Sequence, residues 1–304
     1  MIAATSPAPT RSTRNVPLPR SKALPEPIAV QLEPLVRLAL LEDLGRAGDL
    51  TTEAIVPAQA RAQAAVVARE AGVIAGLECA RLAFALLDLH CDFEARVSDG
   101  APVLAGATVA TIRGSARALL TGERTALNFL CRLSGIATAT HHLVGLIKHE
   151  TARITCTRKT TPGLRMLEKY AVSAGGGMNH RFGLDDAVLI KDNHIALAGG
   201  IVPAVERVRE RVGHLVKIEL EVDTLQQLRE ALSTQIDAVL LDNMTPAELS
   251  QAVQTVGGKL ITEASGGIDA RNLLPIARTG VDLISVGWLT HSAPSLDIAL
   301  DIIG

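Results

Sequence analysis

The clearest pattern in the chain is a regular alternation of short apolar runs and longer amphipathic runs after residue 150. The short runs predict strands, and the longer runs have the three-to-four-residue apolar spacing of helices that bury one face. We expect strands at 153–158, 187–191, 215–222, 237–242, 259–265 and 282–287. We expect helices between them at 163–174, 200–212, 224–233, 246–255 and 270–278, three of them preceded by the capping residues Asp223-Thr224, Thr245-Pro246 and Asp269.

This alternation predicts a parallel sheet whose strands are joined by right-handed helical crossovers. The regular region is shorter than the ~250 residues of a full eight-unit barrel. We therefore expect an incomplete parallel α/β barrel of six or seven strands as the catalytic domain, residues 135–289. No GxGxxG follows a strand and no P-loop motif occurs, which disfavours a dinucleotide fold and a P-loop fold.

The first half of the chain has a different pattern. Residues 31–44 have helical spacing, residues 61–115 alternate β-leaning runs with Gly turns, and residues 116–148 predict one or two helices. These features predict an N-terminal α+β sandwich domain, residues 28–134, onto which the amphipathic segment 290–304 packs back. Asp49 and Thr51 are expected to have structural roles there.

Residues 1–27 are rich in Pro, Ser, Thr and Ala and carry basic residues with no acid before Glu26. This composition predicts a disordered basic tail, and a transit peptide is the alternative.

Composition excludes several classes of function. Apolar residues make up 48% of the 304 residues, enough for a large core, while aromatics are only 2%, too few for a base-stacking surface. The net charge of -2 gives no general attraction to nucleic acid or anionic membranes. The four cysteines include no CxxC pair and no 18-residue apolar run occurs, so we expect free thiols and a cytoplasmic protein.

Polar residues or glycines stand where each predicted strand ends. If the strands are parallel, these groups share one rim, which is where α/β barrels bind substrates. His180-Arg181 adds cationic groups between the first two strands. Several fixed cations indicate a small ligand with more than one negative charge. The strand-end groups are Arg158-Lys159, Lys191, Glu221, Asp242, Ser265-Gly266-Gly267 and Val286-Gly287.

Two acids on neighbouring strands are candidates for binding a metal or a sugar. The period of two places Lys217, Glu219 and Glu221 on one face of their strand, where we expect Lys217 and Glu219 to pair and leave Glu221 for ligand. Asp242 ends the next strand in the same way. Together Glu221 and Asp242 suit Mg²⁺ held partly by substrate phosphates. The alternative is that they only balance the nearby cations.

Two small-residue loops predict a site for a phosphate. Ser265-Gly266-Gly267 precedes a helix, and small residues let backbone N–H groups approach an anion at a helix start. Val286-Gly287 ends the last strand, and barrel phosphate sites commonly use the loops after the last two strands. A plain tight turn is the alternative for the first loop. We expect His291 beside the second loop to be structural.

Three motifs without a gap carry a resemblance to a known family. They are TRKTTPGLR at 157–165, GGGMNHR at 175–181 and LIKDNH at 189–194, and together they resemble the signature of quinolinate phosphoribosyltransferases. ERTALN at 123–128 and the ED and GDLTT pieces at 42–52 are similar to that family too. The resemblance covers the chain from about residue 35 onward. It implies conversion of quinolinate and 5-phosphoribosyl-1-pyrophosphate to nicotinate mononucleotide, pyrophosphate and CO₂ in NAD biosynthesis.

The resemblance also implies roles for individual residues. Arg124 would reach the active site of a neighbouring subunit, which implies a homodimer with shared sites. Arg132, eight residues later, is expected from the helical pattern alone to be a solvated charge. Lys159, Lys191, Glu221 and Asp242 are the expected catalytic residues, with Glu221 and Asp242 also holding Mg²⁺. The remaining substrate-binding residues are expected to be Thr157, Arg158, His180, Arg181, Ser265, Gly266, Gly267, Val286, Gly287 and Trp288.

Three alternatives remain open from the sequence. A non-decarboxylating nicotinate phosphoribosyltransferase would bind one carboxylate and would not require so many cations. A Schiff-base lyase would use Lys191 as its nucleophile. A non-catalytic metabolite-binding protein would keep the cations without the chemistry. We expect no nucleic-acid or membrane partner.

Overall fold

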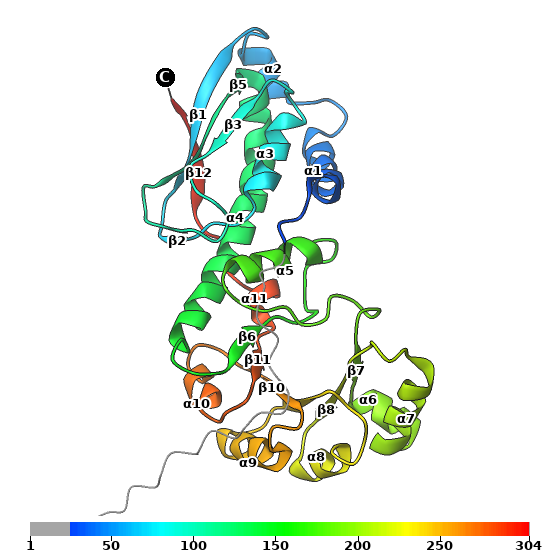
Figure 1. Ribbon diagram of the computed structural model, residues 1–304. Coiled ribbons are helices and arrows are strands. Elements are labelled where there is room, and N and C mark those ends of the chain that lie inside the picture. Colours follow the sequence, from blue (N-terminus) through cyan, green and yellow to red (C-terminus); the bar gives the residue numbers. More distant parts are fainter. Residues whose placement is uncertain (1–24, 304) are drawn as a thin grey trace, which may run out of the picture. The chain divides into compact units, whose positions relative to one another are not determined.

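The computed structural model describes residues 25–303 (Figure 1). They form two compact units, which are described separately below. The described part of the first unit comprises His149–Arg153 and Gly183–Ser285, and that of the second comprises 25–148, Ile154–Phe182 and 286–303. Most of the predicted basic tail lies outside the described residues.

Five strands of the first unit belong to a six-stranded sheet in the order β6-β11-β10-β9-β8-β7, and the boundary between the units falls within the edge strand β6, after Arg153. All six predicted strands are present, each shorter than expected. The order follows the chain except that β6 joins the sheet beside β11, so β6 and β7 do not pair and the barrel is open between its first two strands. The strands are β6 (Arg153–Thr155), β7 (Val188–Ile190), β8 (Ile218–Val222), β9 (Ala238–Asp242), β10 (Ile261–Ser265) and β11 (Leu283–Ser285).

Five helices of this unit connect its strands, and in Figure 1 α6 to α9 line one face of the sheet. They are α6 (Asp192–Ala198), α7 (Ile201–Arg211), α8 (Leu225–Ala231), α9 (Pro246–Val256) and α10 (Leu273–Ala277). Thr224 and Thr245 cap α8 and α9 as predicted, their hydroxyls accepting from Gln227 N and Glu248 N at 3.2 and 3.3 Å. The predicted cap at Asp269 is wrong, because α10 begins after Asn272 and the Asp269 carboxylate binds Arg271 instead.

Strand β8 has the predicted two-faced pattern. Ile218, Leu220 and Val222 are buried, while Glu219 and Glu221 between them are half-buried. The predicted Lys217–Glu219 pair is wrong: Lys217 precedes the strand, and its Nζ lies 2.6 Å from Oδ1 of Asp237, which stands just before β9. The charged face of β8 therefore carries two acids without a lysine of its own.

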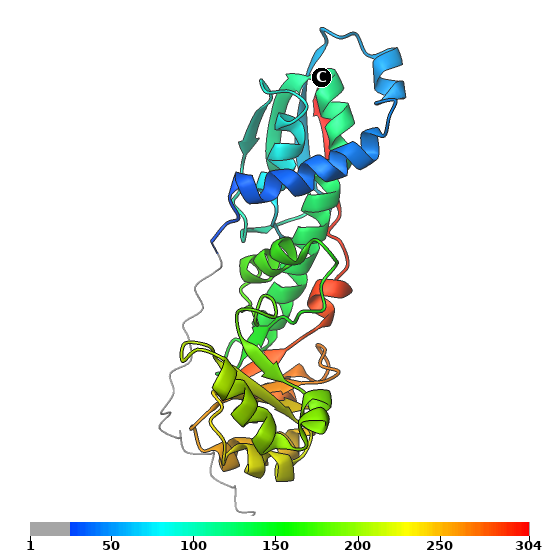
Figure 2. The ribbon, with the colours of Figure 1, turned by 90° about the vertical axis from the view of Figure 1, so that its right-hand side faces the viewer.

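The second unit contains an antiparallel sheet in the order β12-β1-β5-β3. Its strands are β1 (Arg61–Ala68), β3 (Asp92–Ala95), β5 (Thr108–Ser115) and β12 (Ile298–Ile303), beside a two-stranded ribbon of β2 (Gly72–Val73) and β4 (Pro102–Val103). The helices are α1 (Ala29–Leu44), α2 (Leu50–Ile55), α3 (Leu77–Ala85), α4 (Ala116–Leu146), α5 (Arg165–Ala174) and α11 (Trp288–His291). Figure 2 shows α1 crossing α4. The separate antiparallel sheet and the open parallel sheet confirm the predicted fold class.

Helix α4 is the spine of the second unit. Leu119, Leu130, Leu133 and Ile136 along it are fully buried, each contributing about 1.5–3 kcal/mol by leaving water. A side chain at Gly135 would lie 2.0 Å from Pro294 O, so only glycine lets the segment leading to β12 cross the helix. This crossing and the pairing of β12 with β1 confirm that the last segment packs back on the N-terminal sheet.

Asp49 caps α2 by accepting a 2.9 Å bond from Thr52 N. A hydrogen bond from the Thr52 hydroxyl, followed by this backbone bond, holds the pKa of the Asp49 carboxyl below its usual value. This geometry confirms the structural role expected of Asp49.

Candidate active site

Four predicted site residues stand in a row at one edge of the parallel sheet. Glu221, Asp242 and Ser265 are at or next to the carboxyl ends of β8, β9 and β10, and Lys191 follows β7. These four strands are consecutive neighbours in the sheet, and Asp242 is directly opposite Ser265 in the β9–β10 register. The structure therefore brings together the strand-end groups of the first unit.

Lys191 and Glu221 form an ion pair. Lys191 Nζ lies 2.8 Å from Glu221 Oε2, with the Glu221 side chain 12% exposed and the Lys191 side chain 48% exposed. The other Glu221 oxygen has no hydrogen-bond partner among residues 25–303. The pair thus presents one ammonium group and one available carboxylate oxygen at the rim.

Asp242 is oriented by a residue that the sequence analysis did not single out. Asn243 Nδ2 donates to Asp242 Oδ2 at 2.6 Å, which leaves Oδ1 without a partner in the described part of the chain. Asn243 has φ 54°, a left-handed conformation that asparagine tolerates better than most residues. The only sequence feature that could have pointed to Asn243 is its position directly after Asp242 at the end of a strand.

The Ser265-Gly266-Gly267 loop is shaped by the Asn243 turn. Gly266 and Gly267 have φ of 101° and 57°, and a side chain at Gly266 would lie 2.2 Å from Asn243 Oδ1. Asn243 N donates to Ser265 O at 3.0 Å, which fixes the loops after β9 and β10 to each other. Turn geometry explains both glycines, so their contact with a phosphate stays a prediction.

A second pair of acids lies on the same sheet. Glu219 on β8 and Glu263 on β10 have carboxylate oxygens within 4.8 Å of each other, and Glu263 is buried. Glu263 stands two residues before Ser265, so the period of two gives it the same face as that site residue. Glu263 was not among the site residues predicted from the sequence.

In the second unit, the segment Thr157–Thr161 carries the predicted cations. Thr157 Oγ1 accepts from Lys159 N at 3.0 Å, which closes a tight turn around Arg158. Arg158 is half-buried, and its Nε is buried with no hydrogen-bond partner in the described part of the chain. An unpartnered guanidinium nitrogen is costly unless a ligand supplies an acceptor.

Lys159 is exposed, and its side chain passes Gly287. A side chain at Gly287 would lie 3.1 Å from Lys159 Cδ, so the absence of one lets the lysine pass. The structure thus places the predicted Lys159 and Gly287 together. Val286 is buried and its N–H donates to Thr155 O at 2.9 Å, so neither its side chain nor its N–H is available to a ligand. Trp288 is half-buried and packs against the core of this unit.

A buried lysine holds the backbone of the His180-Arg181 segment. Lys169 Nζ donates to His180 O at 2.9 Å and to Cys156 Sγ at 3.1 Å, and Lys169 is fully buried. Arg181 N donates to His180 Nδ1 at 2.8 Å, which fixes the imidazole. Lys169 therefore ties the residue before Thr157 to the His180-Arg181 segment.

The prediction for Arg132 is wrong. Its guanidinium is an ion-pair partner of Glu168, which is fully buried, and its side chain is only 23% exposed. Arg124, eight residues earlier on α4, is exposed. Its predicted contact with a partner subunit stays a prediction.

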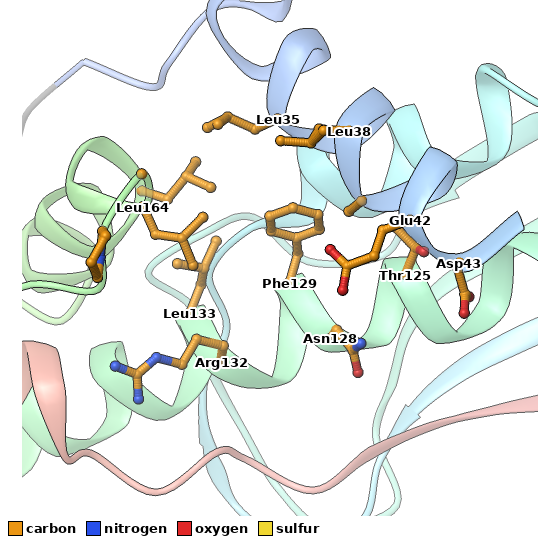
Figure 3. A pocket seen from close by; sticks show the side chains of 14 residues that line it. Leu35, Leu38, Glu42, Asp43, Thr125, Asn128, Phe129, Arg132, Leu133 and Leu164 are labelled. Atoms are coloured by element: carbon orange, nitrogen blue, oxygen red, sulfur yellow. The ribbon is translucent and has the colours of Figure 1, made fainter. Parts of the chain in front are cut away.

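A cavity of about 530 Å³ in the second unit lies among α1, α4 and the residues that precede α5 (Figure 3). Leu35, Leu38 and Phe129 give it an apolar wall, with Glu42 and Arg132 among its few charged groups. It has none of the predicted substrate-binding residues. Its chemistry does not suit a small dianion.

An open α/β barrel with acids and a lysine at its strand ends, and with an arginine- and lysine-rich segment after its first strand, defines an enzyme of small anionic substrates. Residues 49–134 and 136–301 match the N-terminal and C-terminal domains of quinolinate phosphoribosyl transferase. The chain belongs to the quinolinate phosphoribosyl transferase family.

Relatives are similar over nearly their whole length. The chain is 46% identical over 273 residues to a probable nicotinate-nucleotide pyrophosphorylase (carboxylating) of Bacillus subtilis, covering 90% of this chain and 94% of the relative. It is 45% identical over 275 residues to the corresponding protein of Mycobacterium leprae, covering 88% and 95%.

Solved structures agree with this assignment. The nicotinate-nucleotide pyrophosphorylase from Francisella tularensis matches with a TM-score of 0.89 at 38% identity, covering 93% of this chain and 100% of that chain. Human nicotinic acid phosphoribosyltransferase matches with a TM-score of 0.59 at 13% identity, covering 84% and 72%, which shows a shared fold alone.

Proposed function

We propose that the chain uses its two groups of polar side chains to catalyse the reaction of its family. Quinolinate and 5-phosphoribosyl-1-pyrophosphate are converted to nicotinate mononucleotide, pyrophosphate and CO₂, a step of NAD biosynthesis. The carboxylating pyrophosphorylase activity in the relatives' names is this reaction in reverse. The observation that carries the proposal for the residues is the row of Lys191, Glu221, Asp242 and Ser265 along neighbouring strand ends.

The cationic residues suit the two adjacent carboxylates of quinolinate. Arg158, Arg181 and Lys191, helped by His180 and Thr157, are proposed to bind them. Charge-assisted hydrogen bonds contribute about 1.5–3 kcal/mol each, so three or four outweigh the cost of desolvating a dianion. The buried Nε of Arg158, which no described residue pairs, supports a ligand at that position.

The acids suit the phosphoribosyl group and a magnesium ion. Glu221 and Asp242 each have one carboxylate oxygen held by a neighbour and one without a partner in the described ranges. Hard oxygen donors of this kind, together with phosphate oxygens, are the ligands Mg²⁺ prefers. When bound with the donor substrate, Mg²⁺ would supply charge neutralisation to the departing pyrophosphate.

The backbone of two loops suits the 5-phosphate. Gly266 and Gly267 of the first loop and Gly287 of the second have no side chain to cover their backbone, as in anion sites at loop-helix junctions. The N–H of Val286 is not among these groups, because it donates to Thr155 O. We assign them to the phosphate at the far end of the ribose, with Trp288 following the second loop.

The chemistry then needs mainly alignment and charge. The ring nitrogen of quinolinate attacks C1 of the ribose as pyrophosphate leaves, through a transition state with oxocarbenium character that Glu221 and Asp242 stabilise. Lys159 neutralises the leaving pyrophosphate. The new pyridinium nitrogen stabilises the carbanion formed when the C2 carboxylate leaves as CO₂, and C2 then takes up a proton from water. Fixed charges that face developing charge account for most of such a rate enhancement.

We also propose a cytoplasmic homodimer in which Arg124 serves the site of the neighbouring subunit. Arg124 is exposed on α4, as that role requires. Within residues 25–303, no helix has the length and apolar character needed to cross a bilayer.

The alternatives are less well supported. A nicotinate phosphoribosyltransferase binds a single carboxylate, and the likeness to such an enzyme is one of fold alone. A Schiff-base lyase requires an uncharged lysine, whereas Lys191 is used as the cation of an ion pair.

One assay separates these functions. The purified protein is given quinolinate or nicotinate with 5-phosphoribosyl-1-pyrophosphate and Mg²⁺, and CO₂ and nucleotide are followed together. We expect one CO₂ for each nucleotide from quinolinate, none from nicotinate, and loss of both products when EDTA removes the metal. Nucleotide formed from nicotinate without CO₂ would refute the proposal.

A further inference from the structure

An ion pair with a buried carboxylate joins α4 to α5, the helix that follows the Thr157–Thr161 segment. Arg132 on α4 places Nη2 2.8 Å and Nε 3.3 Å from Glu168 Oε1 on α5. Glu168 is fully buried. Buried ion pairs contribute little net stability, because desolvation offsets their attraction. Their fixed geometry is the property that distinguishes them from an apolar contact.

Glu168 extends the pair into the basic segment. Its Oε2 accepts from Thr161 N at 2.9 Å, and its Oε1 accepts from Thr161 Oγ1 at 2.8 Å. Both carboxylate oxygens are therefore engaged. Thr161 ends a segment that has no helix or strand of its own and is held by such side-chain bonds.

Arg132 extends the pair in the other direction. Its Nη2 donates to Thr290 O at 2.8 Å and its Nη1 to Ala293 O at 3.0 Å, which fixes α11 and the residues after it. Thr290 Oγ1 in turn donates to Lys159 O at 2.7 Å. The backbone of Lys159 is thus clamped from α11, and that of Thr161 from α5.

The guanidinium points away from the apolar wall of the nearby cavity, as Figure 3 shows for Arg132 relative to Phe129. It donates to three separate acceptors, Glu168 Oε1, Thr290 O and Ala293 O. The planar guanidinium with its several N–H groups suits this arrangement, and the ammonium group of a lysine does not. The contacts account for the guanidinium without any ligand.

We propose that Arg132 and Glu168 are positioning residues that hold Lys159 in the orientation needed to neutralise the leaving pyrophosphate. This inference rests on the proposed function and deepens it. It assigns a role in the transition state to two residues that act only through the basic segment and α11.

The test uses Arg132→Ala and Glu168→Gln with Arg117→Ala as the matched control. Arg117 is on the same helix and also donates to two backbone carbonyls, Val56 O at 2.8 Å and Glu53 O at 3.1 Å, but it contacts α2 and its following residue instead of the basic segment. Each variant is assayed well below its own melting temperature.

We expect Arg132→Ala and Glu168→Gln to lower kcat at least about tenfold while the KM for quinolinate changes less than about threefold, because small misplacement of a catalytic group has large effects on rate. Arg117→Ala is expected to lower the melting temperature and keep kcat within about twofold of the wild type. Equal kcat losses in Arg132→Ala and Arg117→Ala at equal loss of stability would overturn the proposal.

Two further measurements separate positioning from general support. The Lys159→Ala/Arg132→Ala double variant should have a kcat within about twofold of that of Lys159→Ala alone, because the effects of residues that act as a unit do not add. Millimolar guanidinium should restore part of kcat to Arg132→Ala, and not to Lys159→Ala. Additive losses or no rescue would refute the inference. An inactive wild-type protein would instead refute the proposed function.

Discussion

At the scale of single residues, several of the groups proposed to meet the substrates are oriented by a residue that contacts them. Asn243 holds one oxygen of Asp242, Glu221 pairs with Lys191, and the backbone of Arg181 fixes the His180 ring. Supports of this kind hold a charged group in place before a ligand arrives. They lower the cost of ordering the site when the substrates bind.

The arginines offer the first prediction. We expect Arg158→Ala and Arg181→Ala each to weaken quinolinate binding at least about tenfold, because each removes a charge-assisted bond worth about 1.5–3 kcal/mol. Isothermal titration calorimetry of quinolinate with each variant measures the effect. Arg278→Ala is the control, since Arg278 pairs on the surface with Glu150. Unchanged binding in both site variants would refute their assignment.

Candidate site residues that stand at strand ends could be predicted from the sequence. The residues that hold the site residues in place could not. Lys191, Glu221 and Asp242 stand where apolar runs stop, so periodicity located them. Arg132 gives no such signal, because a charged residue on an amphipathic helix has the same spacing whether its side chain contacts water or a buried acid. Its partner Glu168 is 36 residues away, and only folding shows that they meet.

At the scale of elements, α5 is fixed by three consecutive buried polar residues. Glu168 binds Arg132, Lys169 binds Cys156 and His180, and the Tyr170 hydroxyl donates to Asp99 Oδ2 at 2.9 Å. Asp99 also accepts from the N–H groups of Gly76 and Leu77 at the start of α3. Helix α5 therefore fixes the segments before and after it, which carry the predicted quinolinate cations of this unit.

Burial of Asp99 makes stability depend on pH, and the hydrogen bond from Tyr170 opposes the effect of burial on the pKa of Asp99. Burial raises the pKa of Asp99 above its usual value, and burial also raises the pKa of Tyr170. A carboxyl whose folded pKa is raised binds its proton more tightly in the folded state, so its contribution to stability is full below the unfolded pKa and declines as pH rises through the folded pKa.

Tyr170→Phe removes a donor to the ionised carboxylate and should raise the pKa of Asp99 further. We expect the variant to be about 1–2 kcal/mol less stable than the wild type at pH 7, with a smaller difference near pH 4, where Asp99 is more protonated. Urea unfolding at a series of pH values measures this. The same substitution in an Asp99→Asn background should show no such pH dependence, and a gap that is constant with pH would contradict the argument.

Most elements could be predicted from periodicity, and there is a physical reason why the others were missed. The six parallel strands follow from buried apolar runs between capped helices. Helix α6 was missed because its first turn, Asp192-Asn193-His194, is polar and exposed and directly continues a strand. The position of β6 beside β11 pairs segments that are far apart in the chain, which no local pattern reveals.

At the scale of the whole molecule, the proposed homodimer makes a prediction about mixed subunits. Arg124 and Lys191 are proposed to serve each site from different subunits. Mixing inactive Arg124→Ala with inactive Lys191→Ala protein should then give mixed dimers with one intact site, and about a quarter of wild-type activity when exchange is random. Activity and native mass spectrometry of the mixture measure both quantities.

The control for that experiment is a mixture of Arg158→Ala with Lys191→Ala, two residues proposed to serve the same subunit's site. This mixture leaves no site intact and should stay inactive. Free exchange without recovered activity in the first mixture would show that Arg124 does not act across subunits.

The pairing of β12 with β1 has a consequence for how the protein is made. On the ribosome, β1 emerges long before β12, and all six barrel strands are translated between them. Until β12 arrives, the nascent sheet has an open edge at β1, and unpaired edges promote aggregation. A chaperone that shields this edge during translation would therefore raise the yield of native protein, and premature termination before Ile298 would release a product prone to aggregate.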